Sequence, residues 1–299
     1  MWFRNLQLFR LTDAWNLTGE VLAEKLTRKA FQGCGASDRV ARGWVPPRGI
    51  EGEPVFAQQG QQLIALGIEQ KLLPPAVVRQ YAQARTAEIE AAQGYRPGRK
   101  QLREIFEQIE QELLPRAFVK RSLTYVWIDP VHRLLVVDAA SSARADEVIE
   151  QLKLALGELP LTLLKTRLTP ATALTRWLAA GDAPGSFSID RDCELRAATE
   201  ERAAVRYVRH GLDSDEIRAH IAAGKTATRL ALTWNDRISF VLTEQLQIKR
   251  LAFLDLLKEE AERQAEGSDD LFAADFVLMS GELALLVAEL IEALGGEGE

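Results

Sequence analysis

The segment Gly224-Lys225-Thr226 is the part of the sequence that comes closest to a nucleotide-phosphate motif. A phosphate-binding loop needs a glycine five residues before its Gly-Lys pair, and Ala219 stands at that position instead. Such a loop also follows a strand and opens a helix, whereas the pattern here predicts the reverse order. The segment is therefore typical of a glycine that ends a helix, and no phosphate loop is expected.

Other catalytic and metal-binding motifs are missing because the spacing of the reactive residues is wrong. No serine stands in a Gly-x-Ser-x-Gly sequence, which excludes a nucleophile elbow. The histidines and cysteines are too dispersed to indicate a zinc site; they are His132, His210, His220, Cys34 and Cys193. We therefore expect a protein that is not an enzyme, with no catalytic residues, no bound metal and no cofactor.

Two groups of basic residues could bind phosphate groups without recognising a nucleotide sequence. The denser group contains Arg96, Arg99, Lys100, Arg103, Arg116, Lys120 and Arg121, and the second contains Arg202, Arg206, Arg209 and His210. On composition alone, dispersed charge that keeps the protein in solution is the more common explanation of such groups.

Phe118 stands inside the basic sequence Arg116-Ala117-Phe118-Val119-Lys120-Arg121, directly after Pro115. An aromatic side chain in a basic turn can stack on a base or insert between two base steps. A phenylalanine at the start of a strand more often belongs to the core, and the residues alone favour that explanation.

Net charge is unevenly distributed along the 299 residues. The whole chain carries −6, but residues 255–299 carry about −11, which leaves +5 for the rest. The negative total therefore does not exclude a polyanion as a partner. On the last predicted helix, Glu282, Glu289 and Glu292 lie opposite an apolar stripe and are expected to face solvent.

The hydrophobic pattern predicts an α+β fold in which antiparallel sheets pack against helices and a helical hairpin projects from one sheet. Strands are expected at Trp2–Arg10 and Leu63–Leu73, a structured loop at Gly33–Gly52, and a helix start at Asp213. We predict a first α+β domain made of residues 1–73 and 118–180, interrupted by the hairpin at 74–117. A second α+β domain with an acidic helical end is predicted at 181–299.

The sequence also bears on the compartment. No run of about 18 apolar residues predicts a membrane span, and residues 1–5 do not start a secretory signal. Two cysteines do not form a disulfide framework. We expect a cytoplasmic protein without a membrane partner.

Several ordered blocks along nearly the whole chain resemble the RdgC family of recombination-associated proteins from proteobacteria. Early blocks are Trp2-Phe3, Cys34-Gly35, Gly43-Trp44-Val45-Pro46-Pro47, Leu113-Leu114-Pro115-Arg116-Ala117-Phe118 and Trp127-Ile128-Asp129. Later blocks are Gly224-Lys225, Leu230-Ala231-Leu232, Lys249-Arg250-Leu251, Asp275-Phe276, Gly281-Glu282-Leu283 and Leu294-Gly295-Gly296-Glu297.

The resemblance implies a nucleoid-associated protein without enzymatic activity that binds double- and single-stranded DNA with little sequence preference. It implies a homodimer closed into a ring around DNA, which restrains RecA-promoted strand exchange. It further implies that Phe118 faces DNA, with Arg116 and Lys120 beside it. Arg209 and His210 match a polar, basic pair of the family. Because the second residue of the pair is a histidine here, we expect its contribution to DNA binding to depend on pH.

Two other classes of function stay open from the sequence. The protein could inhibit RecA by direct contact through its acidic helices, without using DNA. It could also be a nuclease or an ATPase, although the motifs for either are missing.

Overall fold

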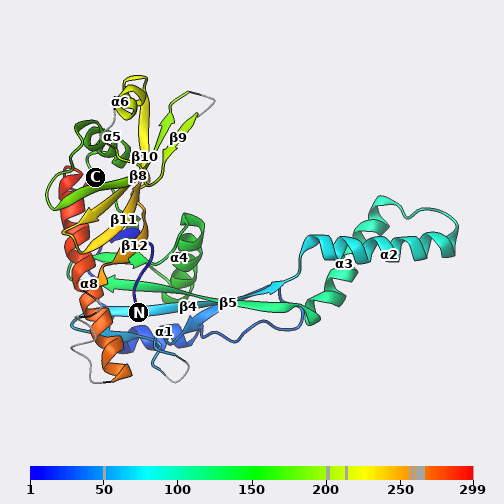
Figure 1. Cartoon of the computed structure of the whole chain (residues 1–299). Coiled ribbons are helices and arrows are strands. Elements are labelled where there is room, and N and C mark those ends of the chain that lie inside the picture. The colour runs from blue at the N-terminus through cyan, green and yellow to red at the C-terminus, as the bar shows by residue number, and fades with distance from the viewer. Residues whose placement is uncertain are drawn as a thin grey trace.

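The computed structural model describes residues 1–49, 52–199, 203–212, 215–255, 257, 259 and 267–298. In this part of the chain the strands form two antiparallel sheets, with helices packed against them (Figure 1). The predicted α+β class with antiparallel sheets is therefore confirmed. Arg202 and the helix start expected at Asp213 lie outside the described residues.

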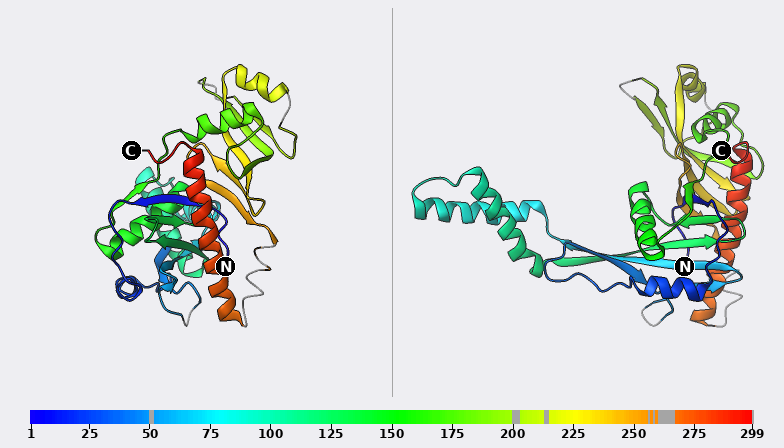
Figure 2. Two further views of the ribbon diagram at one scale, coloured as in Figure 1. Left: turned by 90° about the vertical axis from the view of Figure 1, so that its left-hand side faces the viewer. Right: turned by 180° about the vertical axis from the view of Figure 1, so that it is seen from behind.

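The first sheet is built around two long neighbouring strands. Its order is β2 (Val40–Val45), β4 (Gln61–Leu72), β5 (Phe118–Asp129), β6 (Leu134–Val137), β1 (Gln7–Leu11) and β7 (Leu161–Leu163), with β3 (Phe56–Gln58) on β4. Residues 62–69 of β4 are all buried because both faces of the sheet are covered there. On one face, Ile64 and Leu66 pack with α1 (Gly19–Thr27) and α4 (Ser142–Leu156), which lie together in Figure 2.

The second sheet has helices on one face. Its order is β12 (Ile248–Phe253), β11 (Ile238–Thr243), β10 (Lys225–Trp234), β8 (Phe187–Ala197) and β9 (Ala204–Tyr207). The helices α5 (Pro170–Ala180), α6 (Asp215–Ala222) and α8 (Ser268–Ala293) contribute to the core on that face. In Figure 1, α5 and α8 lie to the left of this sheet, so its other face is directed to the right.

One hydrophobic core connects the two sheets. Leu63 and Trp127 of the first sheet belong to the same buried cluster as Leu230 and Leu232 of the second. Because side chains alternate across a strand, Leu63 enters this cluster while its neighbour Ile64 faces α1 and α4. The domain boundaries predicted from the sequence stay predictions.

The first six residues connect the two sheets, and the first strand begins later in the chain than predicted. Regular pairing starts at Gln7, not Trp2, because Leu6 forms a bridge with Ile248 of the second sheet. The backbone N–H groups of Arg4 and Asn5 donate to Asp138, next to the first sheet. Burial raises the pKa of the Asp138 carboxyl, although these N–H groups oppose the change.

Helix α8 runs along the outer side of the core. Phe276, Met279 and Leu283 are buried in the core. Its residues Leu271–Ala293 are long and apolar enough to cross a membrane, with a mean hydropathy of 1.9. One such helix is weak support for a span because a core helix passes the same test.

The expectation that three acids of α8 face solvent was partly wrong. Glu292 is exposed, but Glu282 lies 3.1 Å from Arg237, and Glu289 accepts a hydrogen bond from Trp234 Nε1 at 2.9 Å. These partners are the last residue of β10 and a residue of the turn after it, which come close to α8 only after the sheet has formed. Two of the three carboxylates therefore bind other side chains of the same molecule.

Two helices follow β4 and precede β5, and in Figure 1 they lie beyond the ends of these strands, away from both sheets. Helix α2 (Pro75–Gln93) begins with a proline in its first turn and ends at Gly94, whose φ is 79°. Helix α3 (Arg99–Leu113) follows Gly98, and a 3₁₀ turn at Leu114–Arg116 leads into β5. Val78, Ala82, Ile105 and Ile109 are buried between the two helices. We call residues 70–120 the arm.

Three strands were missing from the sequence prediction: β2, the short β3 and β8. The predicted loop at Gly33–Gly52 contains β2, in which Gly43 approaches Phe31 so closely that a Cβ atom would lie 2.4 Å from its Cα. The glycine that suggested a loop thus permits close packing inside a sheet. Strand β8 was missed because polar residues interrupt its apolar pattern on the face without helices.

Candidate nucleic-acid interface

Phe118 lies at the first position of β5, where the arm joins the sheet. It pairs with Leu72 of β4, and 84% of its surface is exposed. A large apolar side chain in this state contributes nothing to the core, so the structural explanation favoured by the residues alone was wrong. The exposed ring is available to a partner.

Two exposed cations flank Phe118. Arg116 belongs to the 3₁₀ turn, and Lys120 pairs with Gln70 across the ribbon of β4 and β5. Phe118 and Lys120 share a face because they are two positions apart on one strand. Within the described residues, neither cation has a carboxylate at ion-pair distance, so both charges are available to an anion. We call Arg116 and Lys120 the arm cations.

Arg121 differs from its neighbours. Its Nη2 atom lies 3.2 Å from Glu69 Oε2, and its guanidinium lies 4.9 Å from the centre of the Phe31 ring. The pKa of Glu69 is lowered chiefly by a hydrogen bond from the Cys34 N–H and also by Arg121. Arg121 is therefore held by Glu69 of β4 and by Phe31 of the loop that precedes β2.

The remaining predicted arm residues lie at the other end of α3. Arg96 is in the turn between α2 and α3, Arg99 and Lys100 begin α3, and all three are exposed. Lys100 lies 4.0 Å from Glu104 on the same helix. Helix α3 has fifteen residues, about 22 Å along its axis, and most of it lies between this group and Phe118. The predicted residues of the arm thus fall into two places.

Arg209 and His210 follow β9 at the edge of the second sheet. Arg209 has a φ of 52°, and its N–H donates to Asp192 Oδ1 at 2.8 Å. The His210 ring lies 5.4 Å from that of Tyr207, and its Nδ1 is 2.7 Å from the Gly211 carbonyl oxygen. Both side chains are exposed after the end of β9.

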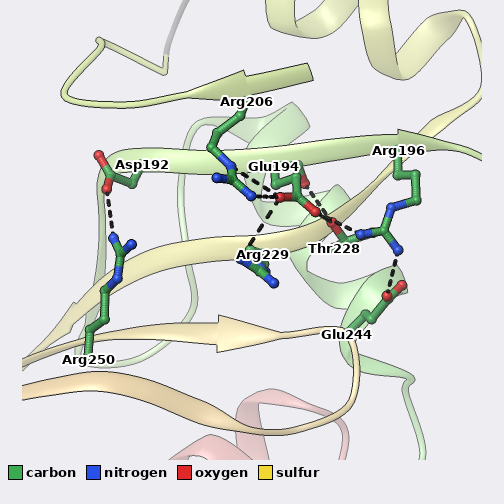
Figure 3. Close-up of polar contacts among 8 residues, drawn as sticks. All are labelled: Asp192, Glu194, Arg196, Arg206, Thr228, Arg229, Glu244 and Arg250. Carbon is green, nitrogen blue, oxygen red and sulfur yellow. Dashed lines mark hydrogen bonds and ion pairs between the residues drawn. The ribbon is translucent and has the colours of Figure 1, made fainter. Parts of the chain in front are cut away.

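The face of the second sheet without helices carries a cluster that the sequence analysis did not identify as a unit (Figure 3). Glu194 lies at its centre and is almost completely buried. Its carboxylate is 2.5 Å from Arg206, 2.8 Å from Arg196 and 4.0 Å from Arg229. Thr228 Oγ1 donates to it at 3.0 Å. We call this side of the sheet the open face.

The arginines determine the protonation state of Glu194. Its pKa is lowered to about 2, first by the hydrogen bond from Arg206, against the opposing effect of burial. Thr228, Arg229 and Arg196 act in the same direction. Glu194 is therefore charged at neutral pH and holds several guanidinium groups in place.

Further charges surround this cluster. Arg250 lies 3.6 Å from Asp192, and Arg196 lies 3.3 Å from Glu244. A cavity of about 120 Å³ opens between the strands, and Arg206, Arg229, Lys249 and Arg250 contribute to its wall. Burial, and then the charge of Arg229, lower the pKa of Lys249. The cations of this face outnumber its carboxylates.

Strand register explains why the open face was not found from the sequence. Glu194 pairs with Arg206 on one side and with Arg229 on the other, positions that are 12 and 35 residues away along the chain. The alternating polar residues of β8 were the available signal. The sequence analysis placed Arg206 in a basic group but did not identify Glu194 as its partner.

This chain is similar to the members of one protein family over nearly its whole length. The family model described as "Putative exonuclease, RdgC" matches residues 1–297, and the chain belongs to the RdgC family. It is 55% identical over 300 residues to the Recombination-associated protein RdgC of Dechloromonas aromatica (strain RCB), covering 99% of this chain and 98% of that protein. It is 50% identical to the protein of the same name from Janthinobacterium sp. (strain Marseille), covering 100% and 99%. The resemblance inferred from the sequence blocks is confirmed.

Proposed function

We propose that this protein binds DNA as a homodimeric ring and restrains RecA-promoted strand exchange by occupying the DNA. It accepts double- and single-stranded DNA without reading the sequence, and it acts on the nucleoid in the cytoplasm. Membership of a recombination-associated family supports the general process. The mechanism rests on the arrangement of charges and aromatic groups.

The exposed ring of Phe118 between the arm cations is the observation that carries this proposal. An aromatic face stacks on any base, and cations without a carboxylate partner bind any phosphate. Neither interaction depends on base identity. The combination therefore supports binding without sequence preference.

The open face adds a second cationic surface on the side of the molecule where the arm lies (Figure 1). Helix α8, which carries much of the acidic C-terminal part, lies on the opposite side of the sheet. A protein of net negative charge can hold a polyanion if its cations are gathered on one side. This separation supports an inner, DNA-facing side.

A two-fold ring needs two kinds of self-complementary contact. The arm carries exposed apolar side chains that could form one of them: Leu72, Tyr81, Tyr95 and Phe106. Their position far from both cores supports contact with a second subunit. A closed ring would hold DNA topologically even though each phosphate contact is weak.

Fluorescence anisotropy with labelled duplex and single-stranded oligonucleotides tests DNA binding. We expect affinity to fall as salt rises, and Phe118→Ala to weaken binding about tenfold, because one stacked base contributes about 1–3 kcal/mol. Leu163→Ala, which removes another exposed apolar side chain, is the matched control. Equal affinity of Phe118→Ala and the control would contradict the role of Phe118.

The ring is tested with closed circular and linear DNA of the same sequence. Crosslinking the arms through engineered cysteines should leave protein on circular DNA after a high-salt wash but not on linear DNA. Sedimentation should give twice the mass of the 33.3 kDa chain. A monomer, or equal loss from both DNAs, would contradict encirclement.

The two alternative functions give different results in a strand-exchange assay. Direct contact with RecA predicts that inhibition persists when Arg116→Glu with Lys120→Glu prevents DNA binding. The family description also names an exonuclease, so labelled DNA should be incubated with the protein and Mg²⁺. Among the described residues, no group of three His, Cys, Asp or Glu side chains could hold a metal ion. Release of nucleotides would contradict the proposed non-enzymatic function.

A further inference from the structure

A row of side chains crosses the open face of the second sheet from one edge strand to the other. Arg206 of β9 pairs with Glu194 of β8, which pairs with Arg229 of β10. On the same face, Val241 of β11 lies diagonally from Arg229 and pairs with Lys249 of β12. All five residues line the cavity of about 120 Å³. Each strand of the sheet thus contributes one side chain.

Charge along this row is compensated at one end only. At the β9 end, Arg206 bonds directly to Glu194 at 2.5 Å. Arg229 reaches Glu194 only at 4.0 Å, the outer limit of an ion pair. Within the described residues, Lys249 has no carboxylate at ion-pair distance, and it is close enough to Arg229 for the two charges to repel. An anion between Arg229 and Lys249 would remove this repulsion.

The cavity is suited to a small oxyanion. Its volume corresponds to roughly four water molecules, taking about 30 Å³ for each. Exposed cations continue on both sides of it, because Arg206 and Arg250 have 59% and 76% of their side-chain surface exposed. A free metabolite would need only the cavity, whereas a long polyanion would use the whole row.

We propose that Arg229 and Lys249 hold one backbone phosphate of a nucleic-acid strand, and that this strand crosses the second sheet along the row, at right angles to the β-strands. Four strand spacings make the row about 19 Å long. This length is enough for a few consecutive nucleotides of one strand. Glu194 is a positioning residue that keeps Arg206 and Arg229 side by side.

This inference rests on the proposed function and adds a second contact to it, far from Phe118. The test measures the affinity for a single-stranded oligonucleotide at several salt concentrations. Lys249→Met keeps the apolar stem and removes one charge. Arg176→Met, an exposed position on α5 at the opposite side of the sheet, is the matched control.

We expect Lys249→Met to reduce the slope of log affinity against log salt by about 0.7, the value for one phosphate contact with a single strand, and to weaken binding about fivefold to tenfold at 0.1 M salt. Arg229→Met should have a similar effect, and Arg176→Met should have none. Unchanged melting temperatures would show that the variants are folded. A slope equal to that of the unmodified protein would overturn the proposed path across the sheet.

Failure of the inference can be distinguished from failure of the proposed function. If the unmodified protein binds DNA with a strong salt dependence but Lys249→Met does so equally well, only the inference fails. If the unmodified protein does not bind DNA, the proposed function fails and the inference with it. A third experiment adds inorganic phosphate. If phosphate raises the melting temperature of the unmodified protein but not of Lys249→Met, and Lys249→Met binds DNA normally, the cavity is a free-anion site. That result would contradict the nucleic-acid path.

Discussion

The arm and the open face hold their cations in different ways. On the arm, Arg116 and Lys120 stand in solvent without a carboxylate partner among the described residues. On the open face, Glu194 fixes Arg206 and Arg196, and Asp192 lies beside Arg250. Free cations attract a polyanion from a distance, whereas fixed cations lose less side-chain entropy when they bind it. We therefore expect the arm to dominate affinity and the open face to define the path of the strand.

The largest effect should come from reversing the arm cations. Arg116→Glu with Lys120→Glu removes two phosphate contacts and adds two repelling charges, so affinity for DNA should fall at least about 100-fold at 0.1 M salt. Lys153→Glu with Arg176→Glu changes the same charge at exposed positions on α4 and α5 and is the control. Similar losses in the two double variants would show that net charge, and not location, determines binding.

The next largest effect concerns the stability of the open face. Glu194→Ala leaves several arginines close together without their central carboxylate, and we expect the free energy of unfolding to fall by about 2–3 kcal/mol. Urea denaturation followed by circular dichroism measures this change. A loss below about 0.5 kcal/mol would show that solvent already satisfies these arginines.

A pH series tests whether the charge of Glu194 is responsible. The pKa of this carboxyl is about 2 in the folded protein, below its ordinary value of 4.5, so the unfolded chain takes up the proton first as pH falls. The stabilisation is complete above pH 4.5 and is lost as pH falls towards 2. The difference in unfolding free energy between the unmodified protein and Glu194→Gln should therefore narrow between pH 5 and pH 2. A difference that is constant over this range would contradict the assignment.

The smallest effect is expected for an ion pair on the arm. Glu107 lies 2.8 Å from Arg103 one turn away on α3, and both side chains are largely exposed. Glu107→Gln should cost only about 0.3–0.5 kcal/mol, because water screens such a pair. Denaturation under the same conditions gives the comparison with Glu194. Equal costs at the two sites would remove the distinction between the regions.

The sequence predicted local structure better than the pairing of distant residues. Pro75 and Gly94, both visible in the sequence, mark the two ends of α2 through their backbone geometry. The position of Glu194 among the arginines depends on two strand registers that no local pattern contains. Exposure of Phe118 could not be inferred from residue type either, since the same pattern is common at the buried start of a strand. The family resemblance supplied what local chemistry did not.

The contacts of the first six residues have a consequence for the order of folding. Leu6 pairs with Ile248, the Leu251 N–H donates to the Arg4 carbonyl, and the Phe3 N–H donates to Met279 Sδ. These residues are made well before their partners, which lie more than 240 positions further along the chain. The core that joins the two sheets therefore cannot be completed before residues 248–279 have been made, and until then the growing chain must keep Phe3 and Leu6 from unsuitable contacts.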